Sequence, residues 1–307
     1  MSPKRSIIVT GGASGIGLGI TRHFICQPET HITILDINPT SGAQTLQQLQ
    51  TEHLSASISF EECDVSSWES QAAVFEKIYA EQGRIDIVFA NAGITEKGSL
   101  LPAKNDGNEA PPKPNLATLN VNLVGVLYST SSSSFKNYTA QCGRSSKVEF
   151  FFFFPISKAV HLAIFYMYKN TTSDPSASSN GLIVCTASNA GLYPFPIAPM
   201  YATTKAGVVG LVRSLARRLA AEKIRINALA PAVIETNIAP STDLFKSMII
   251  TPMHTATNAV AQFVADESLT GKIAEIHGEH VTFAEPPAYV DEDTERNIEN
   301  FWNLGYA

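Results

Sequence analysis

Short apolar, β-branched runs alternate along the first third of the chain with longer segments whose apolar positions recur three and four residues apart. The short runs predict strands and the longer segments predict amphipathic helices. We expect strands at 6–10, 31–35, 57–61 and 85–90, with helices at 16–26, 43–53 and 69–82. Such alternation is typical of consecutive βαβ units and predicts an α/β fold with a parallel sheet.

The alternation is interrupted and then resumes. A Pro-rich segment at 101–115 predicts an exposed loop, and a helical pattern restarts at Leu116. A strand at 182–186, a helix at 201–222 and a strand at 224–230 follow, and the end of the chain looks less regular. The length suits a single domain over 1–283 with a tail at 284–307, in which Phe301 and Trp302 are expected to pack on the body.

Residues 131–157 do not fit this pattern. They open with four serines and end with five phenylalanines before Pro155, and without them the apolar flanks on either side read as one helix. We therefore hypothesise a late insertion, with a translated intron as one source, because a run of Phe codons before Pro resembles a pyrimidine-rich splice-acceptor tract. A genuine surface excursion whose phenylalanines pack on the body is the alternative.

Composition limits the partners. Charged residues are 16% and apolar residues 44% of the chain, and a net charge of −6 with a pI near 5.7 argues against nucleic-acid binding. The apolar run at 150–156 is too short to span a membrane. The four cysteines and seven histidines show no metal-ligand spacing or disulfide framework. We expect a cytoplasmic protein that acts on small molecules and holds no metal.

A glycine-rich turn directly follows the first expected strand and opens the first helix. Gly11, Gly15 and Gly17 are spaced as GxxxGxG, with Ser14 and Ile16 between them. Glycines there permit a tight turn and let amides at a helix N-terminus approach a pyrophosphate. The turn alone is weak evidence, but its setting between a strand and a helix predicts dinucleotide binding.

Asp36 ends the second strand, where a carboxylate can accept both hydroxyls of the adenosine ribose. It would repel a 2′-phosphate, and neither Ala13-Ser14 nor Ile37-Asn38 supplies a cation to neutralise one. NAD is therefore favoured over NADP. The alternative is that Asp36 only begins a turn.

Two further strand ends carry candidate cofactor contacts. Asp64 and Val65 follow the third strand beside the expected adenine pocket, although Ser66 and Glu69 form a plausible capping box that would make Asp64 a helix-start residue. Asn91-Ala92-Gly93 ends the fourth strand, where small residues leave room for a cofactor or simply form a turn.

Tyr201 and Lys205 lie four residues apart and share one helix face, with Ser188 upstream at the end of an apolar strand. A tyrosine has a pKa of about 10, and a nearby ammonium can make its ionisation easier. This set can move a proton on and off an alcohol oxygen. Ordinary helix residues and a turn cap are the structural alternative.

Together these residues resemble the short-chain dehydrogenases/reductases, in order from Thr10 to Thr236. The resemblance implies a Rossmann-type subunit with about seven parallel strands, assembled as a dimer or tetramer. It also implies Asn122 as a fourth catalytic residue that positions a water near Lys205, and cofactor contacts from Ile234 and Thr236. One departure is Ala232 where the family usually has Gly, and another is the long separation between Asn122 and Ser188.

The resemblance implies oxidation of a secondary alcohol, or reduction of the matching ketone, with Tyr201 as the base. A weaker resemblance points to 15-hydroxyprostaglandin-dehydrogenase-type members. We expect either an apolar pocket with a lid or a surface that packs between subunits; the candidates are Tyr193, Phe195, Pro196, Ile197, Met200, Met248 and Met253. A different possibility is an NAD(H)-binding regulatory protein without useful turnover, because residues 131–157 interrupt the helix that Asn122 begins.

Overall fold

The computed structural model describes residues 4–98, 100, 113–126, 158–173, 179–238 and 242–304. Its centre is an eight-stranded sheet in the order β3-β2-β1-β4-β5-β6-β7-β8. The strands are β1 (Arg5–Thr10), β2 (Thr30–Asp36), β3 (Ser57–Glu62), β4 (Ile87–Ala90), β5 (Gly181–Thr186), β6 (Ile224–Pro231), β7 (Ile273–His277) and β8 (His280–Phe283). All neighbours pair in parallel except β7 and β8, which form an antiparallel hairpin at the edge.

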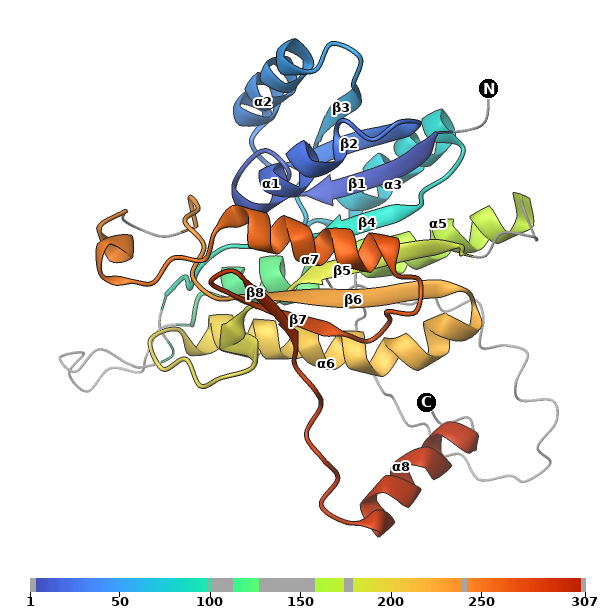
Figure 1. Cartoon of the computed structure of the whole chain (residues 1–307), viewed down its shortest axis with the longest axis vertical. Helices are drawn as coiled ribbons and strands as arrows, with labels where there is room; N and C mark the ends of the chain where they lie inside the picture. Colours follow the sequence, from blue (N-terminus) through green and yellow to red (C-terminus); the bar gives the residue numbers. More distant parts are fainter. Residues whose placement is uncertain are drawn as a thin grey trace.

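Helices cover both faces of the sheet (Figure 1). The side chains of α1, α2 and α7 pack on one face, and those of α3, α5 and α6 pack on the other. The helices are α1 (Gly15–Phe24), α2 (Pro39–Glu52), α3 (Trp68–Gln82), α4 (Ala117–Leu119), the π-helical η1 (Asn120–Val124), α5 (Lys158–Ser173), the 3₁₀ turn η3 (Asn189–Gly191), α6 (Pro199–Ala221), the 3₁₀ helix η4 (Thr242–Ser247), α7 (Met253–Ala265) and α8 (Glu292–Asn303). The predicted α/β, Rossmann-type doubly wound fold is confirmed.

The expectation of a less regular C-terminal part was wrong, because α7, β7, β8 and α8 all follow β6. Strands β1 to β7 form the seven parallel strands that were predicted, and β8 adds an eighth, antiparallel strand at the edge. The buried stripe of α7 consists of Ala256, Ala259, Val260 and Phe263.

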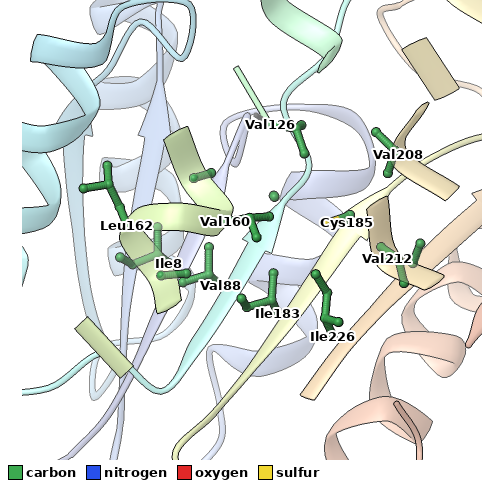
Figure 2. Packing of buried hydrophobic residues seen from close by; sticks show 14 of the residues in the cluster. Ile8, Val88, Val126, Val160, Leu162, Ile183, Cys185, Val208, Val212 and Ile226 are labelled. Atoms are coloured by element: carbon green, nitrogen blue, oxygen red, sulfur yellow. The ribbon is translucent and has the colours of Figure 1, made fainter. Parts of the chain in front are cut away.

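The core on the α5 and α6 side shows why β4 and β5 are apolar on both faces. Figure 2 shows Val160 of α5 beside Val88 of β4 and Ile183 of β5, and Val208 of α6 on the side of Cys185 of β5. Each of these side chains is fully buried. Strands covered on both faces need continuous apolar runs, and burial of each such side chain stabilises the fold by roughly 1.5–3 kcal/mol.

The helix that contains Asn122 meets α5 end to end. The amide of Ala159 donates to the carbonyl of Gly125 at 3.5 Å, where an uninterrupted helix would use the amide four residues further along. The end of the Asn122 helix and the start of α5 therefore lie next to each other. The predicted insertion at 131–157 lies outside the described residues.

The segment after β8 crosses α6, extends away from the sheet and ends in α8 (Figure 1). Arg213 donates to the carbonyls of Ala284 and Glu285, both at 3.0 Å. Arg217 contacts α8 through the Glu299 carboxylate and through the Trp302 ring, whose centroid is 4.5 Å from its guanidinium carbon. No residue of α8 is buried, so these exposed contacts hold the tail loosely.

Candidate active site

A cavity of about 430 Å³ opens at the carboxyl ends of the parallel strands. The strand order reverses between β1 and β4, and in open α/β sheets this is where a ligand crevice forms. Most of the residues predicted for the site lie around it. These are Gly11, Ser14, Gly15, Ile16, Asp36, Asp64, Val65, Asn91, Ala92, Gly93, Ser188, Tyr201, Lys205, Ile234 and Thr236.

Gly17 does not line the cavity but makes the glycine turn possible. A Cβ on Gly17 would overlap the carbonyl oxygen of Gly11 and lie 2.7 Å from Nδ2 of Asn91. Gly11 and Gly15 have φ values of +62° and +51°, in the left-handed region that L side chains rarely adopt. The three glycines therefore serve two purposes: backbone conformation at Gly11 and Gly15, and close packing at Gly17.

The N-terminus of α1 faces this cavity and fits a phosphate group. Ser14 is the N-cap residue, and its side chain makes no capping hydrogen bond. The first-turn amides are thus available beside lining residues Gly15 and Ile16, and the positive end of the helix dipole favours an anion there. Thr236 packs against Gly15 from the opposite wall, 3.3 Å from where a Cβ would be.

Asp36 lies at the end of β2 and lines this crevice. Its Oδ2 accepts from the Ala13 amide at 3.3 Å and its Oδ1 from the Asn38 amide at 3.2 Å. The adjacent Ile37 is 63% exposed and also lines the cavity. Asp36 therefore does form a turn, which was the alternative to a cofactor contact. It also faces the cavity, so both descriptions apply.

The predicted capping box after β3 was wrong. Ser66 is held by Asp64, whose Oδ1 accepts from the Ser66 amide at 2.8 Å and from its hydroxyl at 2.7 Å. The N-cap of α3 is instead Ser67, which accepts from the amide of Ser70 at 3.2 Å. Because Asp64 closes a turn with Ser66, the helix starts one residue later, and Asp64 stays in the cavity wall.

Asn91 braces the three central strands. Its amide and Nδ2 donate to Thr10 of β1 at 2.9 and 3.1 Å, and its Oδ1 accepts from the Thr186 hydroxyl of β5 at 3.0 Å. The sequence predicted only that small residues here leave room. Thr10 and Thr186 were not recognised, because a strand-terminal threonine carries no distinctive local signal.

Asn122 lies behind the cavity wall and is 1% exposed. Its Oδ1 accepts from the Ile94 amide and its Nδ2 donates to the Ile94 carbonyl, both at 2.8 Å. A Cβ on Gly93 would be 3.3 Å from Oδ1 of Asn122 and 3.5 Å from Nζ of Lys205, so Asn122 and Lys205 flank this glycine. Both ends of the Asn122 amide hold the loop that carries Gly93 and Ile94.

Ser188, Tyr201 and Lys205 converge at the other end of the cavity. Ser188 caps η3 by accepting from the Ala190 amide at 3.2 Å, and it also hydrogen-bonds the Tyr201 phenol. Lys205 is 3% exposed; its Nζ donates to the Thr186 carbonyl at 2.7 Å and lies 5.5 Å from the Tyr201 ring centroid. The proton-transfer set predicted from spacing is thus brought together in space.

Burial controls the ionisation of these groups. It raises the pKa of Tyr201, and the Ser188 hydrogen bond opposes that rise. It lowers the pKa of Lys205 to about 8 and raises the pKa of the neighbouring Cys185 thiol to about 12. The easing of Tyr201 ionisation expected from a nearby ammonium is not seen in the protein without cofactor, because desolvation raises the pKa of the phenol and the ammonium of Lys205 is directed to the Thr186 carbonyl.

The predicted substrate pocket was placed incorrectly. Met200 is 2% exposed, and Met253 packs against Gly19 of α1 with its sulfur 2.7 Å from where a Cβ would be. The remaining candidates, Tyr193, Phe195, Pro196, Ile197 and Met248, are exposed and are not among the residues that line the cavity. Phe195 comes nearest, with its ring centroid 6.4 Å from that of Tyr201.

The apolar wall comes from residues that the sequence reasoning missed, including Ile94, Val121, Ala187 and Ile238. Ala232, which replaces the usual glycine, also lines the cavity and donates its amide to the Ile276 carbonyl at 2.8 Å. The backbone there is paired with β7, so the extra methyl group is accommodated without loss of the strand contact.

Among the described residues, no group of three or more His, Cys, Asp or Glu side chains is placed to hold a metal ion. No helix in the described ranges combines the length and apolar character needed to cross a membrane. Cys26, Cys63 and Cys185 are not joined in disulfides, and Cys142 lies outside the described residues.

Comparisons with known proteins agree with this geometry. The family model for short chain dehydrogenase matches residues 5–141 and 157–246, leaving 142–156 unmatched. Short-chain dehydrogenase/reductase ascJ of Acremonium egyptiacum is 30% identical over 88% of this chain and 77% of its own length. The 5'-hydroxyaverantin dehydrogenase of Dothistroma septosporum is 29% identical over 79% of this chain and 72% of its own length.

Solved structures show the same fold. A variant of actinorhodin polyketide ketoreductase with NADPH superposes with a TM-score of 0.66 at 19% identity, over 90% of this chain and 96% of the other. A short-chain type dehydrogenase/reductase from Mycobacterium ulcerans gives a TM-score of 0.68 at 19% identity, over 91% and 90% of the two chains.

Proposed function

Because this chain belongs to the short-chain dehydrogenase/reductase family, we propose that it interconverts a secondary alcohol and the matching ketone with NAD. One observation carries the proposal: Ser188, Tyr201 and Lys205 line the same cavity as the uncapped N-terminus of α1 and Asp36. A proton-transfer set and a dinucleotide cradle share one crevice. Hydride transfer to or from a carbinol carbon needs both.

The cofactor residues fit a nicotinamide dinucleotide. The amides at the start of α1 would hold the pyrophosphate, and Asp36 would accept the hydroxyls of the adenosine ribose. Lys205 would hold the ribose next to the nicotinamide. Asn91 and Gly93 form part of the cavity wall beside it. When bound, the nicotinamide supplies the site that accepts or releases the hydride.

The chain's own groups handle the proton. Ser188 would hydrogen-bond the substrate oxygen, and Tyr201, as phenolate, would take the hydroxyl proton during oxidation and return it during reduction. Lys205 stays near the phenol with its ammonium fixed by Thr186. The positive charge of the oxidised nicotinamide would add to that of Lys205 and offset the burial that raises the pKa of Tyr201.

The preference for NAD rests on the carboxylate of Asp36. The lining next to it includes Ile37, Asp64 and Val65, and none of these side chains is cationic. A 2′-phosphate would therefore meet negative charge without compensation. The actinorhodin ketoreductase structure contains NADPH. At 19% identity, that protein does not determine the cofactor preference of this chain, so our proposal depends on Asp36.

The substrate class follows from the wall of the cavity. Ile94, Val121 and Ile238 favour a small, largely apolar molecule with one hydroxyl or ketone placed near Ser188. One relative is named for the dehydrogenation of a hydroxylated compound. The weaker resemblance to 15-hydroxyprostaglandin-dehydrogenase-type members stays a prediction.

A substrate screen tests this function. Purified protein is incubated with a panel of apolar secondary alcohols and either NAD⁺ or NADP⁺, and reduced cofactor is followed by its absorbance. We expect turnover of at least one alcohol with NAD⁺ preferred. Equal or better use of NADP⁺ would refute the cofactor preference, and no turnover in either direction, with the matching ketones also inert, would refute the enzyme.

The second candidate is an NAD(H)-binding regulatory or catalytically impaired member of the family. The unmatched residues 142–156 favour it, because they fall within the predicted insertion next to the helix that carries Asn122. A form lacking 131–157 distinguishes the two. Because the Ala159 amide hydrogen-bonds the Gly125 carbonyl, the six residues that remain between them after the deletion can close the chain.

Turnover by the shortened form alone would indicate an enzyme impaired by its insertion. NAD binding without turnover in both forms would favour a regulatory role. If full-length mature transcripts contain all codons of 131–157, the intron hypothesis is excluded.

We also propose a cytoplasmic homodimer or homotetramer. Two aromatic side chains on α5, Phe165 and Tyr168, are 46% and 40% exposed, which suits an interface between subunits. The buried thiols Cys63 and Cys185 suit a reducing compartment. Light scattering on the purified protein measures the assembly, and a monomer at micromolar concentration would contradict it.

A further inference from the structure

The first turn of α6, which carries Tyr201, is capped by a residue from another part of the chain. Ala198 occupies the N-cap position and has no side-chain oxygen to accept a hydrogen bond. Pro199 has no amide proton, so Met200 and Tyr201 carry the first-turn amides that need partners. The amide of Ala198 itself donates to Phe195, and the amide of Ala202 donates back to Ala198.

Glu96 supplies both missing acceptors. Its Oε2 accepts from the Tyr201 amide at 2.6 Å and its Oε1 from the Met200 amide at 3.3 Å. A carboxylate at a helix N-terminus gains from charge-assisted hydrogen bonds and from the helix dipole. The cap therefore spans more than a hundred residues of sequence and ties α6 to the loop after β4.

That loop is the same one that forms the wall beside Lys205. Two residues before Glu96, the backbone of Ile94 is clamped by Asn122 through two 2.8 Å hydrogen bonds. One residue after it, the Lys97 amide donates to the buried hydroxyl of Thr118 at 2.8 Å. Glu96 thus projects from a segment that is fixed on both sides.

We propose that Glu96 is a positioning residue that fixes Tyr201 relative to the cofactor wall by joining the first turn of α6 to the 91–97 loop. The catalytic consequence rests on the proposed function of Tyr201, whereas the tether itself does not. Displacement of a reacting group by about 1 Å can cost on the order of 100-fold in rate. A change at Glu96 should therefore act on kcat, because the amides of α1 and Asp36 lie on other elements and hold the cofactor without it.

Two variants separate positioning from simple helix capping. Glu96→Ala removes the tether and the cap together. Adding Ala198→Ser supplies a local N-cap hydroxyl for the first-turn amides and leaves the tether broken. Glu52→Ala is the matched control, because it removes an exposed carboxylate that is also hydrogen-bonded, to Arg22 and Gln48 on the far surface.

For Glu96→Ala we expect kcat to fall roughly 10- to 100-fold with the KM for NAD⁺ within about twofold of the original value. The double variant should recover its melting temperature but keep the low kcat, and Glu52→Ala should keep the original kcat. Recovery of kcat in the double variant would show that Glu96 is only a cap. An unchanged kcat in Glu96→Ala would also overturn the proposal.

Hydrogen exchange gives a readout that does not depend on turnover. In the double variant, the amides at 200–204 should be as protected as in the original protein, while those of Ile94 and Lys97 should exchange faster. Unchanged exchange of Ile94 and Lys97 would refute the tether. If the original protein turns over no substrate, the proposed function fails, and this exchange experiment still decides whether Glu96 joins the two segments.

Discussion

The ammonium of Lys205 donates a hydrogen bond to the carbonyl oxygen of Thr186 at 2.7 Å, deep in the wall of the cavity. Thr186 ends β5, and its hydroxyl in turn holds Asn91 at the end of β4. The charge is therefore fixed by the ends of two central strands. Burial lowers the pKa of Lys205 from 10.5 to about 8, so the folded protein keeps this cation at a cost in stability.

Lys205→Met should make the protein more stable and inactive. The pKa difference implies a penalty of roughly 3 kcal/mol for the charged form, and the lost Thr186 hydrogen bond offsets about 1 kcal/mol of the gain. We expect the free energy of unfolding without cofactor to rise by on the order of 2 kcal/mol near neutral pH. Urea denaturation measures it, and turnover should be lost.

The stability that Lys205→Met gains over the original protein should decrease as the pH rises. The unfolded chain keeps the Lys205 proton up to 10.5 and the folded chain only up to about 8, so the original protein gains stability between these values. The advantage of Lys205→Met should be full below the lower value and should reverse to a loss of about 1 kcal/mol above the upper one, where only the lost Thr186 hydrogen bond remains. Lys272→Met, at an exposed lysine, is the control and should show neither effect. A destabilised Lys205→Met protein at neutral pH would contradict the assignment.

Ser188→Ala should move the pH profile of alcohol oxidation upward. The Ser188 hydrogen bond lowers the pKa of Tyr201, so its loss raises that pKa further. Oxidation needs the phenolate and increases with pH through this pKa, whereas ketone reduction needs the phenol and decreases. We expect the acid limb of kcat to shift to higher pH.

Ser188→Thr retains a hydroxyl and should keep the limb near its original position. Measurement of kcat from neutral to alkaline pH for both variants checks this. If the acid limb of kcat does not move in Ser188→Ala, the claim that Ser188 lowers the pKa of Tyr201 is contradicted.

Gly17→Ala and Gly210→Ala should have opposite effects, although both add one methyl group to a helix. At Gly17 the methyl overlaps the Gly11 carbonyl, so we expect a loss of roughly 1–3 kcal/mol in stability and weaker NAD binding. At Gly210 in α6 nothing lies within 4 Å of the new carbon, so a gain of about 0.5–1 kcal/mol is expected. Thermal unfolding and NADH titration measure both, and normal NADH binding by Gly17→Ala would contradict the packing argument.

Asp36→Asn combined with Ile37→Arg should reverse the cofactor preference. The change removes the carboxylate that opposes a 2′-phosphate and adds a cation at an exposed neighbour. We expect the ratio of kcat/KM for NADP⁺ over NAD⁺ to rise roughly 100-fold, or about 3 kcal/mol. Glu62→Gln, at the residue paired with Asp36 on β3, should leave the ratio unchanged. If the ratio of kcat/KM for NADP⁺ over NAD⁺ does not change in the double variant, Asp36 does not determine the cofactor preference.

Features encoded by neighbouring residues could be predicted from the sequence. The alternating apolar pattern predicted β1 to β6, and the spacing of Tyr201 and Lys205 predicted their common helix face in α6. The glycine turn and Asp36 were placed correctly, because strand ends in a parallel sheet meet at one edge.

Features that depend on distant contacts could not be predicted in this way. Glu96 caps Tyr201 across 105 positions, and Thr186 reaches Asn91 across 95. The methionines at 200 and 253 looked suited to a pocket but are packed within the protein, because an apolar side chain alone does not indicate which surface it joins. The pKa of Tyr201 likewise depends on burial, which spacing does not specify.

The most direct test of the central claim uses Tyr201→Phe. This change removes only the hydroxyl that is proposed to carry the proton and leaves the ring beside Phe195 and Lys205. NADH binding is followed by fluorescence, and oxidation of the best alcohol from the screen is followed by absorbance. The account predicts unchanged NADH affinity with turnover reduced by at least about 100-fold. A Tyr201→Phe protein that binds NADH and retains most of its turnover would contradict it.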